Sequence, residues 1–128
     1  MKRLNFGKLA AVMALLVPLG AEAHHAGAEY DSTSPLRLAG TVKTFDWGNP
    51  HSWLTLTIAS ANGRGTDWLV ECNSVALLER FGWTKTSVKP GDQITVTIAP
   101  HIDGIERGEA IEVVTATGKK LANAIIEP

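Results

Sequence analysis

Four histidines are the side chains of this sequence best suited to chemistry, because the imidazole nitrogen is the commonest metal ligand in proteins. They are an adjacent pair near the start and two isolated residues further along, His24, His25, His51 and His101. If His24 is the first residue of the mature chain, its free α-amine and its own imidazole together chelate one metal ion. A third nitrogen from elsewhere in the chain completes a planar set of nitrogen ligands, which suits Cu(II).

The residues before His24 have the features of a secretory signal peptide. The basic residues Lys2, Arg3 and Lys8 precede an uncharged, mostly apolar run at 9–20, and A-E-A at 21–23 supplies a small-x-small cleavage site. The apolar run is shorter than the ~20 residues that a membrane-spanning helix needs. We therefore expect cleavage after Ala23, export to the periplasm, and no stable membrane anchor in the mature chain.

The cleavage position decides what kind of metal site is formed. With His24 at the terminus, the arrangement resembles half of the histidine brace of exported copper proteins, and His51 or His101 is the expected other half. His25 is the rival ligand from the same segment. A cut one residue earlier leaves Ala-His-His, in which the amine, backbone amides and the imidazole of His25 bind copper without help from the fold. A later cut removes the terminal histidine.

An aromatic cluster offers a second candidate site around W-G-N-P-H-S-W. Trp47 and Trp53 flank the Asn49-Pro50-His51 turn. Tryptophan side chains in this pattern stack on sugars or bases, shield a metal site, or cap a small core. The alternative to a metal site is therefore a metal-free module that binds a glycan, a peptide or a partner protein through Trp47, Asn49 and Trp53. A purely structural accessory subunit is a third alternative.

The charge balance argues against nucleic acid as a partner. The chain has 12 Lys+Arg and 13 Asp+Glu, and after Lys2, Arg3, Lys8 and Glu22 are set aside with the signal peptide, 9 basic and 12 acidic residues leave a net charge of −3. Nucleic-acid binding needs basic residues that neutralise phosphates, and no basic stripe remains. The sequence also lacks the recognised nucleophile, zinc-protease and phosphate-loop motifs, so nothing in it argues for an enzyme.

Three further side chains are interpreted as structural or solvated. Cys72 is the only cysteine, which excludes an intrachain disulfide. We expect it to be a small buried hydrophobic residue, with a soft copper ligand as the alternative. Glu71 and Asp67 belong to the outward side of a predicted strand, and we expect both to be solvated.

Hydrophobic alternation predicts five strands and one helix. The strands are expected at residues 36–45, 53–58, 67–72, 94–98 and 110–117, and a helix at 73–83 is favoured by its capping types and the closing Gly82. The order β-β-β-α-β-β indicates an all-β domain with one short helix, a five-stranded Greek-key barrel of the OB-fold type. An open five-stranded sandwich is the alternative. The expected organisation is a signal peptide at 1–23, an extended arm at 24–35, and the barrel at 36–128.

The OB-fold suggests where ligands bind. Such barrels use the face of strands two and three and the loops that join strands one and two and strands four and five. Here those loops contain His51 and His101. The barrel topology therefore allows the two histidines to converge, but it does not require them to.

Several blocks of the sequence resemble a family of short secreted bacterial proteins catalogued as a domain of unknown function. They are the signal peptide, H-H followed by A-E-Y-D at 28–31, G-T-V at 40–42, W-x-N-P-H-x-W at 47–53, L-L-x-R-x-G-W-T at 77–84 and K-P-G-D at 89–92. The resemblance covers nearly the whole mature chain. It implies export in a Gram-negative bacterium, to the periplasm, and no established activity.

Overall fold

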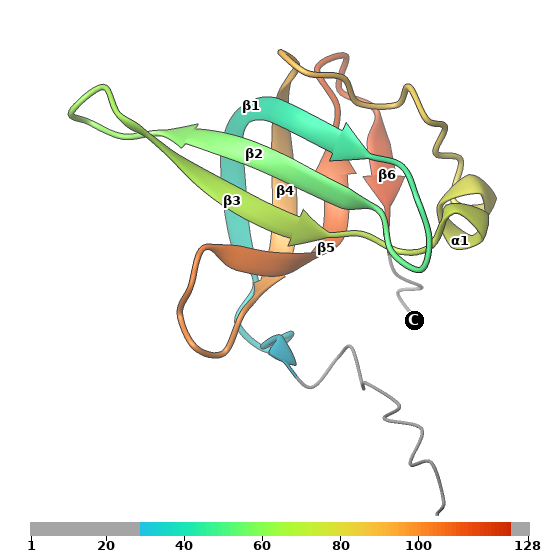
Figure 1. The fold of residues 1–128 in the computed structure, drawn as a ribbon, viewed down its shortest axis with the longest axis horizontal. Coiled ribbons are helices and arrows are strands. Elements are labelled where there is room, and N and C mark those ends of the chain that lie inside the picture. The colour runs from blue at the N-terminus through green and yellow to red at the C-terminus, as the bar shows by residue number, and fades with distance from the viewer. Residues whose placement is uncertain (1–28, 124–128) are drawn as a thin grey trace, which may run out of the picture.

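Six strands and one short helix make up the computed structural model, which describes residues 29–123 (Figure 1). The strands are β1 (Leu36–Asp46), β2 (Trp53–Ala59), β3 (Gly65–Glu71), β4 (Gln93–Pro100), β5 (Arg107–Val114) and β6 (Lys120–Ala122), and the helix is α1 (Val75–Arg80) between β3 and β4. The predicted signal peptide and the histidines His24 and His25 lie outside the described residues. The only helix in the described part of the chain, α1, has neither the length nor the apolar character to cross a bilayer.

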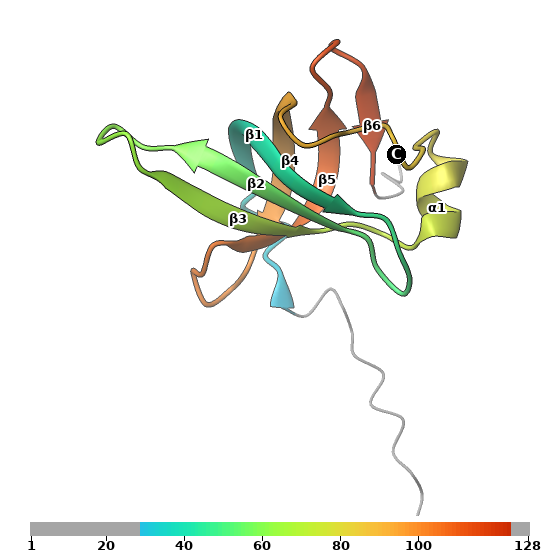
Figure 2. The ribbon, with the colours of Figure 1, turned by 45° about the horizontal axis from the view of Figure 1, so that its top comes forward.

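The strands form one sheet that closes on itself. Their order is β3-β2-β1-β4-β5-β6, all neighbours are antiparallel, and a parallel pairing of β3 with β5 joins the two sides. Figures 1 and 2 show the curled sheet with α1 at one end and the β2–β3 hairpin extending from the other. The expected OB-like barrel is confirmed, with β6 added as a short sixth strand beside β5.

The core lies inside this barrel and is built from the alternating apolar positions of the strands. Leu54 and Leu56 of β2 are fully buried, as is Val70 of β3, and α1 adds Leu78. Gly82 follows the helix with φ +84°, a conformation that glycine adopts without strain. The chain then turns so that Trp83 is buried in the core and its indole N–H donates to the Ala122 carbonyl.

The prediction was wrong about where β5 begins. We expected a loop to run through residue 109, whereas β5 starts at Arg107 and ends at Val114. Arg107, Gly108 and Glu109 pair in parallel with Leu69, Val70 and Glu71 of β3. These polar residues and a glycine have little strand propensity of their own, so the partner strand accounts for their conformation.

β5 packs tightly against β4 at Gly108, the residue that pairs with Val70 of β3. A Cβ atom there would lie 2.5 Å from Ile98 Cδ1 and 2.9 Å from the Ala99 carbonyl oxygen. The backbone of β5 therefore approaches β4 more closely than a side chain allows. On the other edge of β5, the parallel pairing with β3 places the two carboxylate-bearing residues, Glu71 and Glu109, next to each other across the β3–β5 seam.

Candidate functional site

A buried carboxylate forms the centre of the candidate site. Glu71, the last residue of β3, is 7% exposed, although it lies on the outward side of the strand. The expectation that it is solvated was wrong, because side chains from three other segments cover it. We call the group around it the Glu71 cluster, which consists of Tyr30, His51, Trp53, Glu71, His101, Arg107 and Glu109.

The first segment that covers Glu71 is the N-terminal arm, through Tyr30. The Tyr30 hydroxyl donates a hydrogen bond to Glu71 Oε2. The backbone around Tyr30 pairs with the end of β4, since Asp31 N–H donates to the Pro100 carbonyl (2.8 Å) and Ile102 N–H donates to the Glu29 carbonyl (2.9 Å). Tyr30 is buried and anchors the arm to the barrel.

The second side chain that covers Glu71 is that of Arg107, the first residue of β5. Its Nε donates to the Tyr30 hydroxyl at 3.0 Å and its Nη2 donates to Glu71 Oε2 at 3.3 Å. The guanidinium carbon also lies 5.0 Å from the centre of the Trp53 ring, which is a cation–π distance. Arg107 therefore compensates the buried negative charge and spans the β2, β3 and β5 strands.

His51 approaches the same carboxylate from the β1–β2 loop. Its Nδ1 lies 3.3 Å from Glu71 Oε1, and its side chain remains 35% exposed. Backbone bonds fix the loop, because Cys72 N–H donates to the Ser52 carbonyl and Ser52 N–H donates to the Asn73 carbonyl. A carboxylate beside Nδ1 favours the tautomer with its proton on that nitrogen, which leaves the Nε2 lone pair free.

His101 joins the cluster from the β4–β5 loop, but in a different manner. Its ring packs edge-on against Tyr30 with centroids 5.8 Å apart, and its backbone forms a bridge with Tyr30. Its Nδ1 accepts a hydrogen bond from the Asp103 backbone N–H at 3.2 Å. A neutral imidazole in this arrangement carries its proton on Nε2, so neither nitrogen has a free lone pair.

Burial and the paired acids raise three pKa values in and beside the cluster. The pKa of Tyr30 is raised well above its usual value, first by burial and then by its contact with Glu71. The pKa of Glu109 is raised by burial and by the negative charge of Glu71, with His51 acting in the opposite direction. Burial, followed by the charges of Glu71 and Glu109, raises the pKa of the Cys72 thiol to about 12.

The residues proposed for a ligand-binding face have different surroundings. Trp53 lies under Arg107 in the cluster. Trp47 instead packs against Phe45, with ring centroids 5.8 Å apart, and Phe45 packs on the core residue Trp83. The Asn49 side-chain oxygen accepts a hydrogen bond from Val75 N–H at the start of α1.

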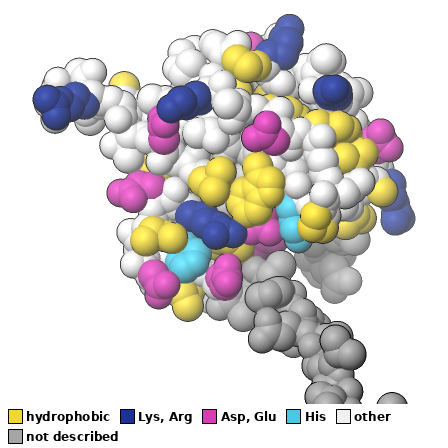
Figure 3. All heavy atoms as spheres, in the orientation of Figure 1, with side chains coloured by type: hydrophobic (Ala, Val, Ile, Leu, Met, Phe, Trp, Pro, Cys, Tyr) yellow, Lys and Arg dark blue, Asp and Glu magenta, His cyan; other side chains and the backbone are white. Residues whose placement is uncertain are grey.

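A metal site cannot be built from the described residues alone. Within residues 29–123 no three His, Cys, Asp or Glu side chains are arranged to hold a metal ion. Figure 3 shows histidine, basic, acidic and hydrophobic side chains gathered on the face that carries the cluster. His51 supplies one exposed nitrogen ligand there, so a metal site needs further donors from outside this part of the chain.

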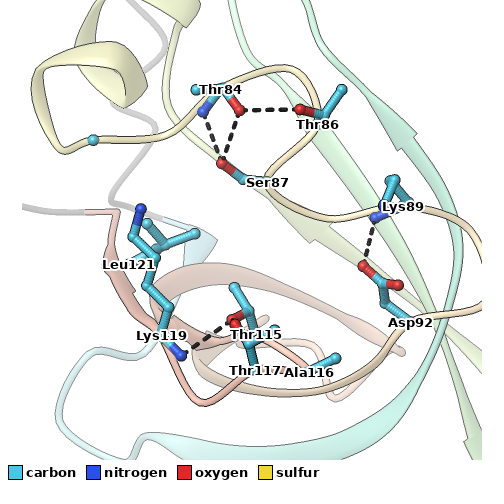
Figure 4. Close-up of a pocket in the computed structure, with 11 residues that line it drawn as sticks. Thr84, Thr86, Ser87, Lys89, Asp92, Thr115, Ala116, Thr117, Lys119 and Leu121 are labelled. Atoms are coloured by element: carbon cyan, nitrogen blue, oxygen red, sulfur yellow. Dashed lines mark hydrogen bonds between the residues drawn. The ribbon is translucent and has the colours of Figure 1, made fainter.

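A hollow in the surface of the described residues lies away from the Glu71 cluster. It has a volume of about 340 Å³ and lies between the segment that follows α1 and the β5–β6 turn (Figure 4). Its hydroxyls bond to neighbouring groups: Thr84 N–H donates to Ser87 Oγ, and Lys119 N–H donates to Thr115 Oγ1. No residue of the Glu71 cluster lines it, so the hollow and the cluster are separate features.

Residues 12–110 match the family of unknown function DUF6152. The chain belongs to this family. The expected resemblance to a domain of unknown function is confirmed, and the matched range includes every residue of the Glu71 cluster. No curated protein matches the chain, and no solved structure matches it either.

Sequence reasoning anticipated His51, His101 and Trp53 but missed Tyr30, Glu71 and Arg107 as members of one site. Tyr30 carried a usable signal, since it is the only tyrosine and stands alone in a small, polar arm. Glu71 and Arg107 carried none, because alternation assigns Glu71 only to an outward side and Arg107 falls in a predicted loop. Their contact depends on the parallel pairing of β3 with β5.

Proposed function

We propose that this protein is an exported metal-binding protein that holds a copper-type ion between its N-terminal histidine and His51. The observation that carries the proposal is the contact between His51 Nδ1 and Glu71 Oε1 (3.3 Å) on a ring that remains 35% exposed. Histidines that bind metals commonly present one nitrogen to the metal and the other to a carboxylate or carbonyl. His51 has the carboxylate partner, and its Nε2 is available.

The position of the arm supports the choice of His24 as the second ligand residue. Tyr30 and His51 contact the two oxygens of the same Glu71 carboxylate. His24 precedes Tyr30 by six residues, which span up to roughly 20 Å when extended. The chain is therefore long enough to bring the amine and imidazole of His24 to His51 without being stretched. His25 remains the alternative donor from the same segment.

The charge of the cluster favours a cation. Glu71 and Glu109 lie side by side across the seam, and Arg107 is the cation that contacts Glu71. Amine and imidazole nitrogens suit Cu(II) better than hard cations, which prefer oxygen. An α-amine with an ordinary pKa of about 7.7–8.0 must lose its proton to bind, so copper affinity should fall as the pH is lowered.

The test compares two histidines of the same cluster. The mature protein is purified from the periplasm, its N-terminus is established by intact mass, and Cu(II) binding is measured by chelator competition. We expect one copper per chain, an affinity reduced at least tenfold in His51→Gln, and a smaller change in His101→Gln, whose Nδ1 already accepts a hydrogen bond from the Asp103 N–H. His24 is tested by preparing the chain with one extra residue before it, which moves the amine away from the imidazole.

Three outcomes contradict the proposal. If the protein with His24 at its terminus binds no copper at stoichiometric concentration, the metal site is refuted. If the mature chain begins Ala-His-His and binds copper equally well in His51→Gln, binding belongs to the terminal peptide and not to the fold. If the chain with His24 at its terminus binds copper as tightly in His51→Gln as in the unaltered protein, the assignment of His51 as a ligand is refuted.

A metal-free binding face is the second candidate, and one observation favours it. The Arg107 guanidinium lies over the Trp53 ring on the outer side of β2 and β3. Leu69 of β3, which is 39% exposed, lies on the same side of the sheet. Under this alternative, Trp53→Ala abolishes tryptophan-fluorescence changes on titration with soluble oligosaccharides or peptides, whereas His51→Gln leaves them unchanged.

A further inference from the structure

The edge of β3 that faces β5 is only partly paired. β5 runs beside residues 69–71 of β3, and Leu69 N–H donates to the Glu106 carbonyl at 3.0 Å. Among the described residues no strand pairs with residues 65–68 on this edge, because β3 has only β2 and β5 as partners. Figure 1 shows this part of β3 extending beyond β5 toward the β2–β3 turn. An unpaired strand edge of this kind is a template for another strand.

The open edge, residues 65–68, lacks the features that commonly block strand addition. Residues 65–67 are exposed, the segment contains no proline, and its pairing with β2 runs through it without a bulge. The backbone groups of a strand point alternately to its two edges, and Leu69 uses its N–H on this edge. Gly65 and Asp67 therefore present their N–H and C=O groups to an added strand.

The two ends of the open edge carry opposite charges. Arg64 is exposed at the end nearest the turn, and the exposed Glu106 flanks the other end. Neither side chain has an oppositely charged group within ion-pair distance among residues 29–123. Leu69 and Ile105, which are 39% and 47% exposed, lie at the same end as Glu106. An edge that is basic at one end and acidic at the other is complementary to a second copy of itself, because antiparallel pairing about a two-fold axis brings opposite ends together.

We infer that the open edge of β3 pairs in an antiparallel manner with the same edge of a second copy of this chain. When the pairing is centred on Thr66, Gly65 of each copy lies opposite Asp67 of the other, and the two residues exchange both of their hydrogen bonds. Glycine has no side chain that could collide with the aspartate. Arg64 of each copy then lies beside Glu106 of the other, so the same ion pair forms twice.

The β2–β3 turn makes room for this arrangement. Just before Arg64 the chain passes through the turn that joins β3 to β2, closed by the hydrogen bond from Ser60 N–H to the Arg64 carbonyl. The second copy therefore leads away from β5 at the point where the open edge ends, and its turn covers Leu69 and Ile105. This inference goes beyond the proposed function and involves no metal.

The experiment measures self-association of the chain as purified from the periplasm, without added metal. Sedimentation equilibrium is recorded from about 10 µM to about 1 mM, because an interface shorter than the standard size associates weakly. Arg64→Glu and Glu106→Lys each reverse one charge, and the double variant restores the pair with the charges exchanged. Arg37→Glu is the matched control, because Arg37 is an exposed arginine of β1 that pairs with β4 and not with β3. Far-ultraviolet circular dichroism checks that each variant is folded.

We expect a monomer–dimer equilibrium that either single reversal weakens roughly tenfold, since a two-fold axis makes each contact occur twice. The double variant should restore association, and Arg37→Glu should associate as the unaltered protein does. Hydrogen exchange at the Gly65 and Asp67 amides should slow as the protein concentration rises. The Leu69 amide, already bonded to Glu106, should not respond. The exchange measurement on the unaltered protein tests the pairing even if a charge variant does not fold.

Three results would overturn the inference. A chain that stays monomeric up to about 1 mM does not pair through this edge. If the chain dimerises but the single reversals leave the dimer unchanged, or the double variant fails to restore it, another surface forms the dimer. Exchange at Gly65 and Asp67 that does not depend on concentration excludes pairing at β3. None of these results bears on copper binding, so the failure of this inference and the failure of the proposed function are distinguishable.

Discussion

Two acidic residues of β3 allow the energetic role of the buried carboxylate to be measured against an internal control. Glu71 and Asp67 lie four residues apart on the same side of the strand. Each accepts from one cation and one hydroxyl: Glu71 from Arg107 and Tyr30, Asp67 from Lys43 and Thr57. The side chain of Glu71 is 10% exposed, and that of Asp67 is 42% exposed. The two carboxylates therefore differ in burial and in the additional contact of Glu71 with His51.

We expect Glu71→Gln to destabilise the folded state by about 2 kcal/mol. Breaking a fully buried ion pair costs about 3–5 kcal/mol, but Arg107 is partly exposed and glutamine keeps the volume and one acceptor. For a domain of this size, about 2 kcal/mol lowers Tm by roughly 8–16 °C. Asp67→Asn should change Tm little, because solvent and salt screen the exposed Lys43 pair.

The assay is thermal unfolding followed by circular dichroism at low and high salt. The effect of Glu71→Gln should persist at high salt, since a buried pair is screened less than an exposed one. Any effect of Asp67→Asn should shrink under the same conditions. Equal shifts of Tm for the two variants, or a Glu71→Gln effect that disappears in salt, would refute the claim that burial makes the Glu71 contacts important.

Three further predictions follow from burial and packing near the seam. Glu109→Gln should raise Tm at neutral pH, because the raised pKa of Glu109 means that the ionised carboxylate destabilises the folded state. Thermal unfolding measured across pH should show that this gain in Tm vanishes below about pH 4.3, the ordinary pKa of a glutamate, where the carboxyl group is protonated in both the folded and the unfolded chain. Cys72, buried and with its pKa raised to about 12, should not react with a thiol reagent at pH 8 until the protein is unfolded by denaturant, and rapid native labelling would contradict this. Gly108→Ala should lower the free energy of unfolding by about 1–3 kcal/mol, because the new methyl group would lie 2.5 Å from Ile98 Cδ1. An unchanged urea midpoint of unfolding would show that β4 and β5 move apart at no cost.

Local pattern in the sequence determined most of the barrel. Period-two alternation located β1, β2, β3 and β4 to within a few residues, and the capping types with Gly82 located α1. The turn residues around Asn49-Pro50 placed His51 in a loop beside the outer side of β2. These features depend on residues that are close together in the sequence, so the local sequence pattern is enough to predict them.

Only the tertiary structure decided that an outward carboxylate is buried. Alternation assigns Glu71 to the side of β3 away from the core, but it carries no information about distant segments that cover that side. Tyr30 lies 41 residues before Glu71, and Arg107 lies 36 residues after it. Their meeting requires closure of the barrel through the parallel β3–β5 pairing. Contacts between residues so far apart in the sequence depend on the closed sheet and not on any local propensity of the residues involved. For that reason the Glu71 cluster could be seen only in the folded chain.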